Sequence, residues 1–423
     1  MKRTKTFLNS LLIIIGSIVL CTLLMILVYT LPTDRAYNYA KNSSDLFSTN
    51  MFKTWSGNNR YAKIDTTSDA IMVDIALCRY YSSPIENAML NPMHEFGEDG
   101  DDPHQKALVS FLEGDTINDY SNYARYWHGY VLFMLPLLSF VDIGGLKMMM
   151  LIAQLLLLIL VSYEFGKRNI VSMLMFSFVI LFINPISTAL SFEYASCYLI
   201  SLLFTYLVLK FNDYFLNNKY YIYLFTICGV LTSFLDLLTF PLVTWGLPLL
   251  SYLLINENNI KKDFVFVINV SLSWIFGYVG MWLGKLVVGS LLTNTNIIAD
   301  AIKEFAFRTN GNVAITFDSY FTRLITAFDN PIIFMLLLSI VLLATYVVIN
   351  IKRINFLQTR LIDLLPIVIV SLSPFVWLFV VKQHSIEHPW LAYRNLSILL
   401  WGIYVIIIKL ICNRKDSINE KEQ

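Results

Sequence analysis

The sequence predicts an all-α integral membrane protein with about ten transmembrane helices, a short re-entrant or half-helix, and a long outer loop after the first span. Of its 423 residues, 57% are hydrophobic and only 14% are charged, whereas soluble domains are normally about a quarter charged. The apolar residues also gather into runs long enough to cross a bilayer as helices. Finally, positive charges collect in alternate connections between these runs, as the positive-inside rule expects of a multi-pass protein.

The first apolar run, residues 7–31, follows Lys2, Arg3 and Lys5. It is longer than the apolar core of a signal peptide, so we predict a retained anchor with its N-terminus in the cytoplasm. Residues 127–141 are apolar but short, and we predict that they dip into the membrane and return, or form a half-helix. Further spans are predicted at residues 146–163, 170–186, 194–211, 220–235, 238–255, 264–292, 331–351, 362–381 and 395–412.

The basic residues between the runs set the predicted orientation. If Lys167 and Arg168 lie inside, the same side receives the remaining basic connections, at Lys210, Lys219, Lys261, Lys262, Lys352, Arg353, Arg360, Arg414 and Lys415. The short turns at residues 187–193 and 236 lie between these connections and contain no Lys or Arg. We therefore predict a multi-pass protein of the cell membrane with both termini cytoplasmic. Residues 1–412 would form one membrane domain and residues 413–423 a charged tail.

The outer side then holds the loop of residues 32–128, with short amphipathic helices, together with residues 184–193, 293–330 and 382–394. Acidic, aromatic and histidine residues concentrate in these segments, so chemistry is expected there. A formal net charge of +1 gives no support for nucleic-acid binding, which needs a basic patch.

Two aspartates of the outer loop are candidate catalytic residues. Asp34 lies just beyond the first span, where a carboxylate could act as a general base on an acceptor hydroxyl. The alternative is an interfacial carboxylate that pairs with Arg35 or is solvated. Asp69 would occupy the first turn of an amphipathic helix capped by Thr67 or Ser68, a position that the helix dipole also explains without any catalytic role.

Arg125 and His128 lie in a stretch rich in Tyr and Trp where the chain enters the membrane. Such cations are costly at that depth unless they bind an anion, and Arg can hold a lipid phosphate by two hydrogen bonds. The alternative is snorkelling at the interface. Asp236, between two apolar runs near the outer boundary, is a further candidate for substrate binding.

The segment of residues 384–394 contains His384, His388 and Arg394. An HxxxH pair can bind zinc when both rings share a helix face, but Pro389 disfavours a helical conformation at His388, and no third ligand is near. We therefore predict a phosphate or sugar site here, with a purely structural interface loop as the alternative.

Neither a metal nor a cofactor is predicted. The acidic cluster of residues 94–104 could offer oxygen ligands to a divalent metal but lacks calcium-loop spacing. A solvated loop explains it better. Five isolated cysteines, with Cys78 alone in the outer loop, are expected to act as small apolar residues.

A first span, a long outer loop with an acid near the membrane exit, and many further spans together resemble the GT-C superfamily of polytopic glycosyltransferases. The tracts at residues 123–129, 136–138, 236–248 and 384–394 are similar to those of a bacterial branch of GT-C-like proteins. The resemblance implies a polyprenyl-phosphate-linked sugar as donor and a glycan or lipid of the cell envelope as acceptor. Asp34 stands where the catalytic Asp of that family would be. Because Arg35 replaces the second of the usual paired acids, the base stays open between Asp34 and Asp69.

Two other functions stay open. A transporter or flippase of lipid-linked glycan would place charged residues in mid-span, and Lys285 is the main candidate for such a residue. A non-catalytic membrane scaffold is the third possibility.

Overall fold

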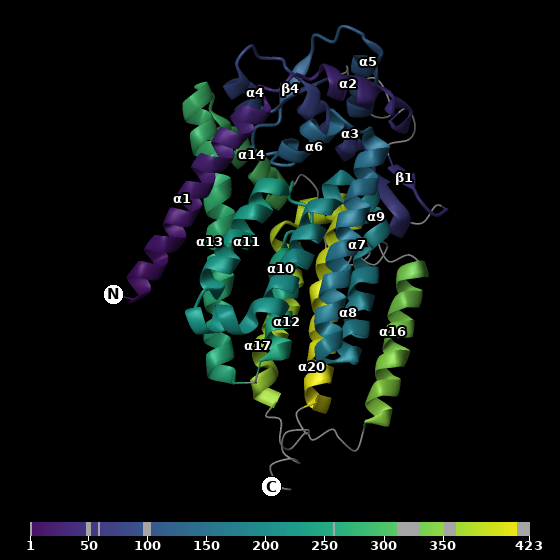
Figure 1. The fold of residues 1–423 in the computed structure, drawn as a ribbon, viewed down its shortest axis with the longest axis vertical. Coiled ribbons are helices and arrows are strands. Elements are labelled where there is room, and N and C mark those ends of the chain that lie inside the picture. The colour runs from purple at the N-terminus through teal and green to yellow at the C-terminus, as the bar shows by residue number, and fades with distance from the viewer. Residues whose placement is uncertain are drawn as a thin grey trace.

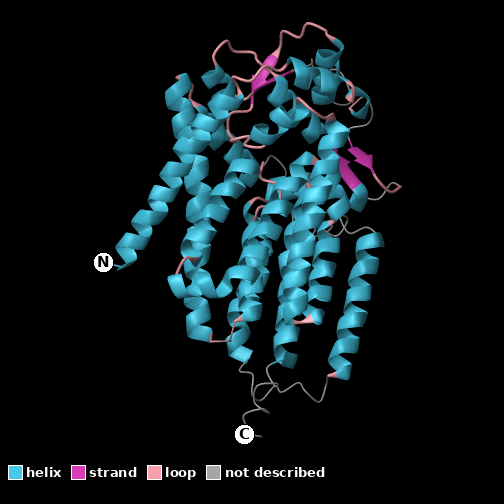
Figure 2. Ribbon diagram, viewed as in Figure 1, coloured by secondary structure: helices cyan, strands magenta, loops and turns pink. Residues whose placement is uncertain are grey.

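The computed structural model describes residues 2–47, 52–57, 60–95, 103–256, 259–310, 330–350 and 361–412. Long, roughly parallel helices form one part, and a cap of short elements covers one of its ends (Figure 1). Among the described residues the strands form only two short antiparallel pairs (Figure 2). The chain is therefore an almost entirely helical protein, as predicted.

Seven helical segments within these described ranges are long and apolar enough to cross a membrane. They comprise α1 (Lys2–Val28), α7 (Ile143–Arg168), α10 (Phe192–Asn218), α13 (Ile260–Thr293), α16 (Asn330–Ile349), η4 (Leu361–Leu364) with α17 (Leu365–Val380), and α19 (Pro389–Ala392) with η5 (Tyr393–Leu396) and α20 (Ser397–Cys412). The protein is thus a multi-pass membrane protein. The other predicted spans are occupied by shorter apolar helices, α8 (Ile170–Ile183), α11 (Tyr221–Leu235) and α12 (Leu242–Ile255).

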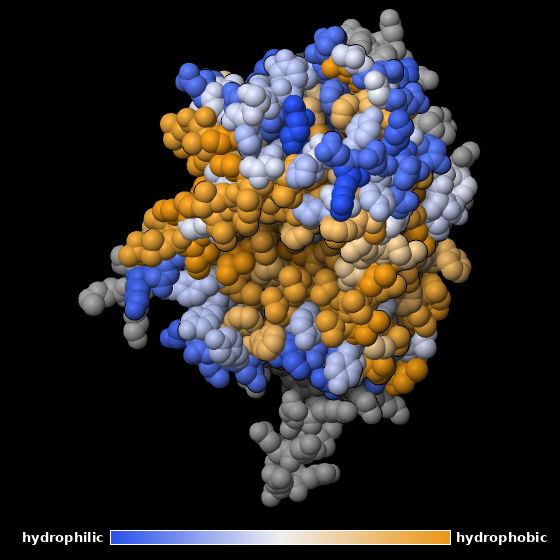
Figure 3. Space-filling model, turned by 45° about the horizontal axis from the view of Figure 1, so that its top comes forward, coloured by the Kyte–Doolittle hydropathy of each residue, from blue (hydrophilic) through white to orange (hydrophobic). Residues whose placement is uncertain are grey.

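The long helices differ in what surrounds them. The apolar window of α10 is 67% buried, whereas those of α7 and α16 are each 17% buried. The exposed apolar side chains join into a band between the hydrophilic cap and a hydrophilic lower edge (Figure 3). A continuous apolar surface of this kind marks contact with lipid, so α10 is central and the other two helices are peripheral.

Helices α11 and α13 pack closely because glycines lie at their contact. A Cβ added to Gly277 of α13 would lie 2.1 Å from the Thr226 carbonyl oxygen, and one on Gly229 of α11 would lie 2.1 Å from the Trp274 carbonyl oxygen. Small residues of this kind let helix backbones approach in a membrane.

The cap comes mainly from the predicted outer loop. Its elements are α2 (Asp34–Lys41), η1 (Ser44–Leu46), β1 (Phe52–Thr54), η2 (Arg60–Ala62), β2 (Lys63–Asp65), α3 (Thr66–Leu77), α4 (Pro84–Leu90), β3 (Pro92–His94), α5 (Pro103–Glu113), β4 (Tyr120–Asn122) and α6 (Val131–Leu138). Strand β1 pairs with β2, and β3 pairs with β4. The other predicted outer segments contribute α9 (Pro185–Leu190), α14 (Ile297–Asn310) and α18 (Lys382–Glu387), where α9 contacts β2 and α14 contacts α18.

Two cap helices are amphipathic as predicted, and one is not. Helix α2 buries Ala36 and Ala40 on one face, and α5 is likewise one-sided. Helix α3 is buried on nearly all sides, because other elements surround it. Its N-cap is Asp65, whose side chain accepts from the Ser68 backbone N–H at 2.9 Å, so the prediction of Thr67 or Ser68 as the cap was wrong.

The short apolar stretch before α7 forms α6, a helix of eight residues. At 1.5 Å per residue it is about 12 Å long, too short to cross a bilayer. It packs on α1, α2 and α3. Asp142 then begins α7 by accepting from the Gly145 N–H at 2.8 Å.

Candidate functional site

A cavity of about 270 Å³ lies where α13, α14 and α17 meet beside the cap. Its walls are mostly aromatic and aliphatic, and two arginines and a glutamate also line it. Its charged and aromatic lining residues include Arg125, Trp274, Tyr278, Trp282, Glu304, Arg308 and Trp377. An apolar cavity with a few converging polar groups is the usual form of a small-molecule site.

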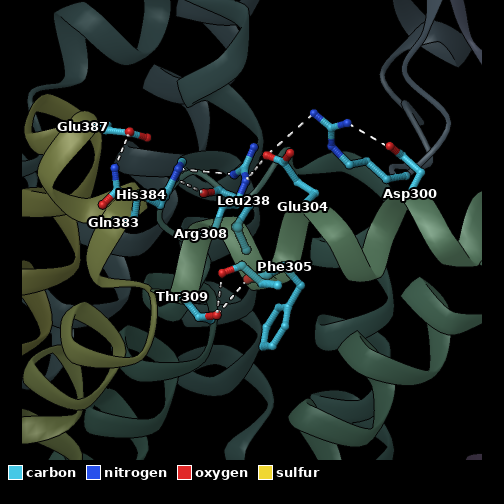
Figure 4. A network of polar contacts seen from close by, with 11 residues as sticks. Leu238, Asp300, Glu304, Phe305, Arg308, Thr309, Gln383, His384 and Glu387 are labelled. Atoms are coloured by element: carbon cyan, nitrogen blue, oxygen red, sulfur yellow. Dashed lines mark hydrogen bonds and ion pairs between the residues drawn. The ribbon is translucent and has the colours of Figure 1, made fainter. Parts of the chain in front are cut away.

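Arg308 lies in the last turn of α14 and is held by two neighbours (Figure 4). Its Nε donates to Glu304 Oε1 at 2.7 Å, and its Nη1 donates to Nδ1 of His384 at 3.2 Å. Burial raises the pKa of Glu304, but the hydrogen bond from Arg308 and the charges of Arg125 and Arg308 lower it overall. Glu304 is therefore ionised and holds the two guanidinium groups on one side of the cavity.

Arg125 keeps hydrogen-bonding capacity for a ligand. Its guanidinium lies over the Tyr123 ring at 4.5 Å. Its ion pairs to Asp300 and Glu304, at 3.6 and 3.8 Å, are longer than hydrogen bonds. Its Nε is buried and has no hydrogen-bond partner among the residues that the structure describes. An anion in the cavity could therefore complete the contacts of Arg125.

A row of rings leads away from Arg308. His384 donates through Nε2 to the Leu238 carbonyl at 3.0 Å, and its ring lies 4.8 Å from that of His388, which lies 5.3 Å from Trp390. Burial, with the charge of Arg308, lowers the pKa of His384 well below its usual range and that of His388 to about 4. Both histidines are thus neutral near pH 7, so they shape the site instead of supplying positive charge.

The row ends at a group of buried acids. Trp390 hydrogen bonds to Asp65, and burial raises the pKa of Asp65 to about 6. Glu193, at the start of α10, lies within electrostatic reach of Asp65 and Asp236. Its Oε2 has no hydrogen-bond partner in the described part of the chain. Asp65 therefore lies at one end of the row of rings and Arg308 at the other.

The two histidines of the HxxxH pair do not lie in one helix. His388 lies just outside α18 as its C-cap, as the following proline predicts. In the ranges that the structure covers, no group of three or more His, Cys, Asp or Glu could hold a metal ion. Most of the acidic cluster predicted at residues 94–104 lies outside the described residues.

Asp69 is placed where it stabilises the fold. It is fully buried and accepts from Lys147 Nζ and the Phe192 N–H, each at 2.7 Å, and from Ser191 Oγ at 3.1 Å. These bonds join α3 to α7 and to the N-terminus of α10, where a carboxylate is favoured by the helix dipole. Both carboxylate oxygens of Asp69 already accept hydrogen bonds from these partners. This makes Asp69 a poor general base, because a base needs an oxygen that can accept the proton of the substrate.

Asp34 is exposed at the start of α2, and its side chain makes no hydrogen bond or ion pair with the described residues. Of the two alternatives to a catalytic role, the pairing with Arg35 is not formed, and the carboxylate is exposed to solvent. Asp34 therefore stays available as a base.

Two predicted anion-binding residues, His128 and Arg394, are buried and bond to other parts of the protein. His128 accepts at Nδ1 from Tyr130 Oη at 3.0 Å and donates from Nε2 to the Tyr123 carbonyl at 2.8 Å. Burial, with the charge of Lys285, lowers the pKa of His128 to about 3. It is therefore a neutral, buried residue whose two ring nitrogens both bond to the protein itself.

Arg394, 1% exposed, donates to the carbonyls of Ile183 and Trp390 and lies over the Tyr194 ring at 4.3 Å. Asp236 accepts from the Thr239 N–H and hydroxyl in the turn after α11. Burial raises its pKa, against these hydrogen bonds. The side chains of Arg394 and Asp236 therefore both form hydrogen bonds within the protein.

Of the predicted residues, Arg125 therefore lines the cavity. His384 lies behind the cavity wall, bonded to Arg308, and His388 lies next to His384. Sequence reasoning missed Arg308, Glu304 and Asp65. Glu304 and Arg308 are spaced i,i+4, a pairing typical of a helix surface, and this signal could have identified α14 within the loop predicted at residues 293–330.

Comparison with known proteins gives no match: no family model, no curated protein and no solved structure is significantly similar to this chain.

Proposed function

We propose that this protein is a membrane glycosyltransferase of the GT-C kind, which moves a sugar from a polyprenyl-phosphate donor to a cell-envelope acceptor on the outer face. The proposal rests on one observation: the apolar cavity beside the cap has Arg125 and Arg308 on its wall. Aromatic and aliphatic walls suit a prenyl chain, and guanidinium groups suit its phosphate.

We infer the orientation from the end opposite the cap. There Glu164 pairs with Lys167 at 3.1 Å, Arg168 at 3.1 Å and Lys210 at 3.6 Å. A basic end is expected to face the cytoplasm, so the cap would face outward and both termini inward, in the cell membrane. In this proposal α8, α11 and α12 cross as well, giving about ten spans.

The proposed reaction is a direct transfer with inversion. The acceptor hydroxyl oxygen attacks the anomeric carbon, the bond from that carbon to the phosphate oxygen breaks, and the lipid phosphate leaves against Arg125 and Arg308. A carboxylate takes the proton of the hydroxyl. Asp34 is free to do so, and Asp65 joins it as a candidate because a pKa of about 6 suits a base near neutral pH.

The transporter alternative has less support. Lys285, the mid-span charge that suggested it, is fully buried and donates to Asn91 Oδ1 at 2.8 Å and the Ala88 carbonyl at 3.1 Å. It thereby holds the C-terminal end of α4 on α13, a structural role.

A transfer assay tests the proposal. Membrane vesicles that contain the protein would receive labelled sugar–polyprenyl phosphates with envelope extract as acceptor. We expect Arg308→Gln to lower transfer about tenfold to a hundredfold, because a hydrogen bond to a charged group contributes about 1.5–3 kcal/mol. Arg35→Gln, which removes an exposed charge on α2, should leave transfer unchanged.

The base is identified by Asp34→Asn and Asp65→Asn in the same assay. The variant that lacks the base should lose about a hundredfold or more of the activity. Full activity in both aspartate variants, or in both Arg125→Gln and Arg308→Gln, would contradict the mechanism.

A further inference from the structure

Asp74, Cys78 and His94 meet in the cap, in a cluster that the proposed transfer reaction does not use. Asp74 and Cys78 are four residues apart at the end of α3, so their side chains lie on one face of the helix. His94 is the last residue of β3. It reaches both side chains because β3 runs against α3.

The imidazole of His94 is held in one orientation. The backbone N–H of His94 donates to Asp74 Oδ2 at 2.7 Å. Its ring nitrogen Nδ1 donates to Asp74 Oδ1, also at 2.7 Å. The ring also stacks on Phe111 at 4.4 Å. Since Nδ1 donates its hydrogen to Asp74, Nε2 is the nitrogen that faces the Cys78 Sγ, at 4.0 Å. A carboxylate, an imidazole and a thiol in this order form the arrangement by which a histidine activates a nucleophile.

Two basic side chains, His94 and Arg79, lie beside the Cys78 sulfur. Burial alone would lower the pKa of His94, but the hydrogen bonds and charges of Asp74 and Cys78 outweigh it and raise the pKa to about 10. Arg79 donates through Nη1 to the carbonyls of Ala76 and Cys78, at 3.0 and 2.8 Å. It therefore offsets the negative end of the α3 dipole next to Cys78. The other titratable group that faces the thiol is Tyr29 of α1, whose hydroxyl donates to the Ile75 carbonyl.

We propose that Cys78, His94 and Asp74 form a peroxide-reactive thiol site. Cys78 is 1% exposed, which leaves access only to a small electrophile, and hydrogen peroxide is a small oxidant that converts a cysteine to a sulfenic acid. The Cys78 sulfur attacks one peroxide oxygen, an S–O bond forms and the O–O bond breaks. The released hydroxide takes the Nε2 proton of His94 and becomes water. The sulfur is oxidised by two electrons to a sulfenic acid, and the peroxide is reduced.

This site revises the expectation that Cys78 is merely a small apolar residue. It is also independent of the glycosyltransferase proposal, because none of its residues lines the cavity.

The test uses the full-length protein purified in detergent. It would be exposed to hydrogen peroxide, quenched with catalase, unfolded and alkylated, and peptide mass spectrometry would give the fraction of each thiol oxidised. Cys78 of the same protein unfolded in denaturant serves as the reference for an ordinary thiol. We expect Cys78 of the folded protein to react at least about tenfold faster than Cys78 of the unfolded protein.

Variants add a second arm to the test. In His94→Gln the rate at Cys78 should fall about tenfold or more, and in Asp74→Asn it should fall less. The comparison of folded with unfolded wild-type protein decides the matter even if these variants fold poorly. The proposal is overturned if Cys78 does not react, if it reacts no faster in the folded than in the unfolded protein, or if a folded His94→Gln variant reacts as the wild type does.

Discussion

Asp69 links three helices through one carboxylate, and its partner Lys147 is 14% exposed. We expect Asp69→Asn to lower the free energy of unfolding by about 3 kcal/mol, because it leaves the mostly buried charge of Lys147 without a partner. Denaturant unfolding in detergent measures this change. The matched control is Asp34→Asn, whose exposed carboxylate should change stability by less than about 0.5 kcal/mol. Equal effects of the two variants would show that Asp69 is not the link that its contacts indicate.

The contribution of Asp65 to the free energy of unfolding depends on pH. The native chain keeps the Asp65 proton up to a pKa of about 6, above the ordinary value of 3.8, whereas the unfolded chain releases it near pH 4. The native state therefore binds more protons between pH 4 and 6, so this contribution to stability falls as the pH rises through that window and is constant above it.

We expect Asp65→Asn to melt at a higher temperature than the wild type at pH 7.5 and at a similar temperature at pH 4. The amide keeps the cap of α3 but carries no charge to desolvate. Thermal melting at both pH values measures the difference. A variant that is less stable than the wild type at pH 7.5 would show that the Asp65 charge stabilises the native state.

At the scale of elements, the contact of α11 with α13 depends on two glycines. We expect Gly277→Ala to destabilise the protein by about 3 kcal/mol or to prevent folding, because the new methyl group would overlap the Thr226 carbonyl. Gly16→Ala in α1 is the matched control, since a Cβ there meets nothing within 4 Å, and it should be neutral or slightly stabilising. Yield and melting temperature in detergent measure both variants, and a Gly277→Ala protein as stable as the control would refute the close packing.

The elements were predicted better than the site. Apolar runs gave a helix at every predicted span for which residues are described, because hydrophobic length is a local property of the chain. The roles of side chains were harder to predict. Asp69 and Arg394 looked like site residues, but their partners Lys147, Phe192 and Ile183 lie far away in the sequence. Arg308 was missed for the same reason, since its neighbour His384 is 76 residues away.

At the scale of the whole molecule, the number of crossings determines which face each segment occupies. We expect reporters fused after residues 218, 236 and 256 to be cytoplasmic, external and cytoplasmic in turn, because α11 and α12 each cross in the proposed topology. Paired fusions to green fluorescent protein and alkaline phosphatase report the two sides. The same side for all three fusions would mean that α11 and α12 form a hairpin that does not cross.

The central claim is that the cavity holds a lipid phosphate between Arg125 and Arg308. Its most direct measurement is the binding of labelled polyprenyl phosphate to the purified protein, compared among the wild type, the double variant Arg125→Gln/Arg308→Gln and the charge control Arg35→Gln. We predict saturable binding of one lipid per chain to the wild type and to Arg35→Gln, and affinity at least about tenfold weaker for the folded double variant. Equal affinity in the double variant and the wild type would contradict this account.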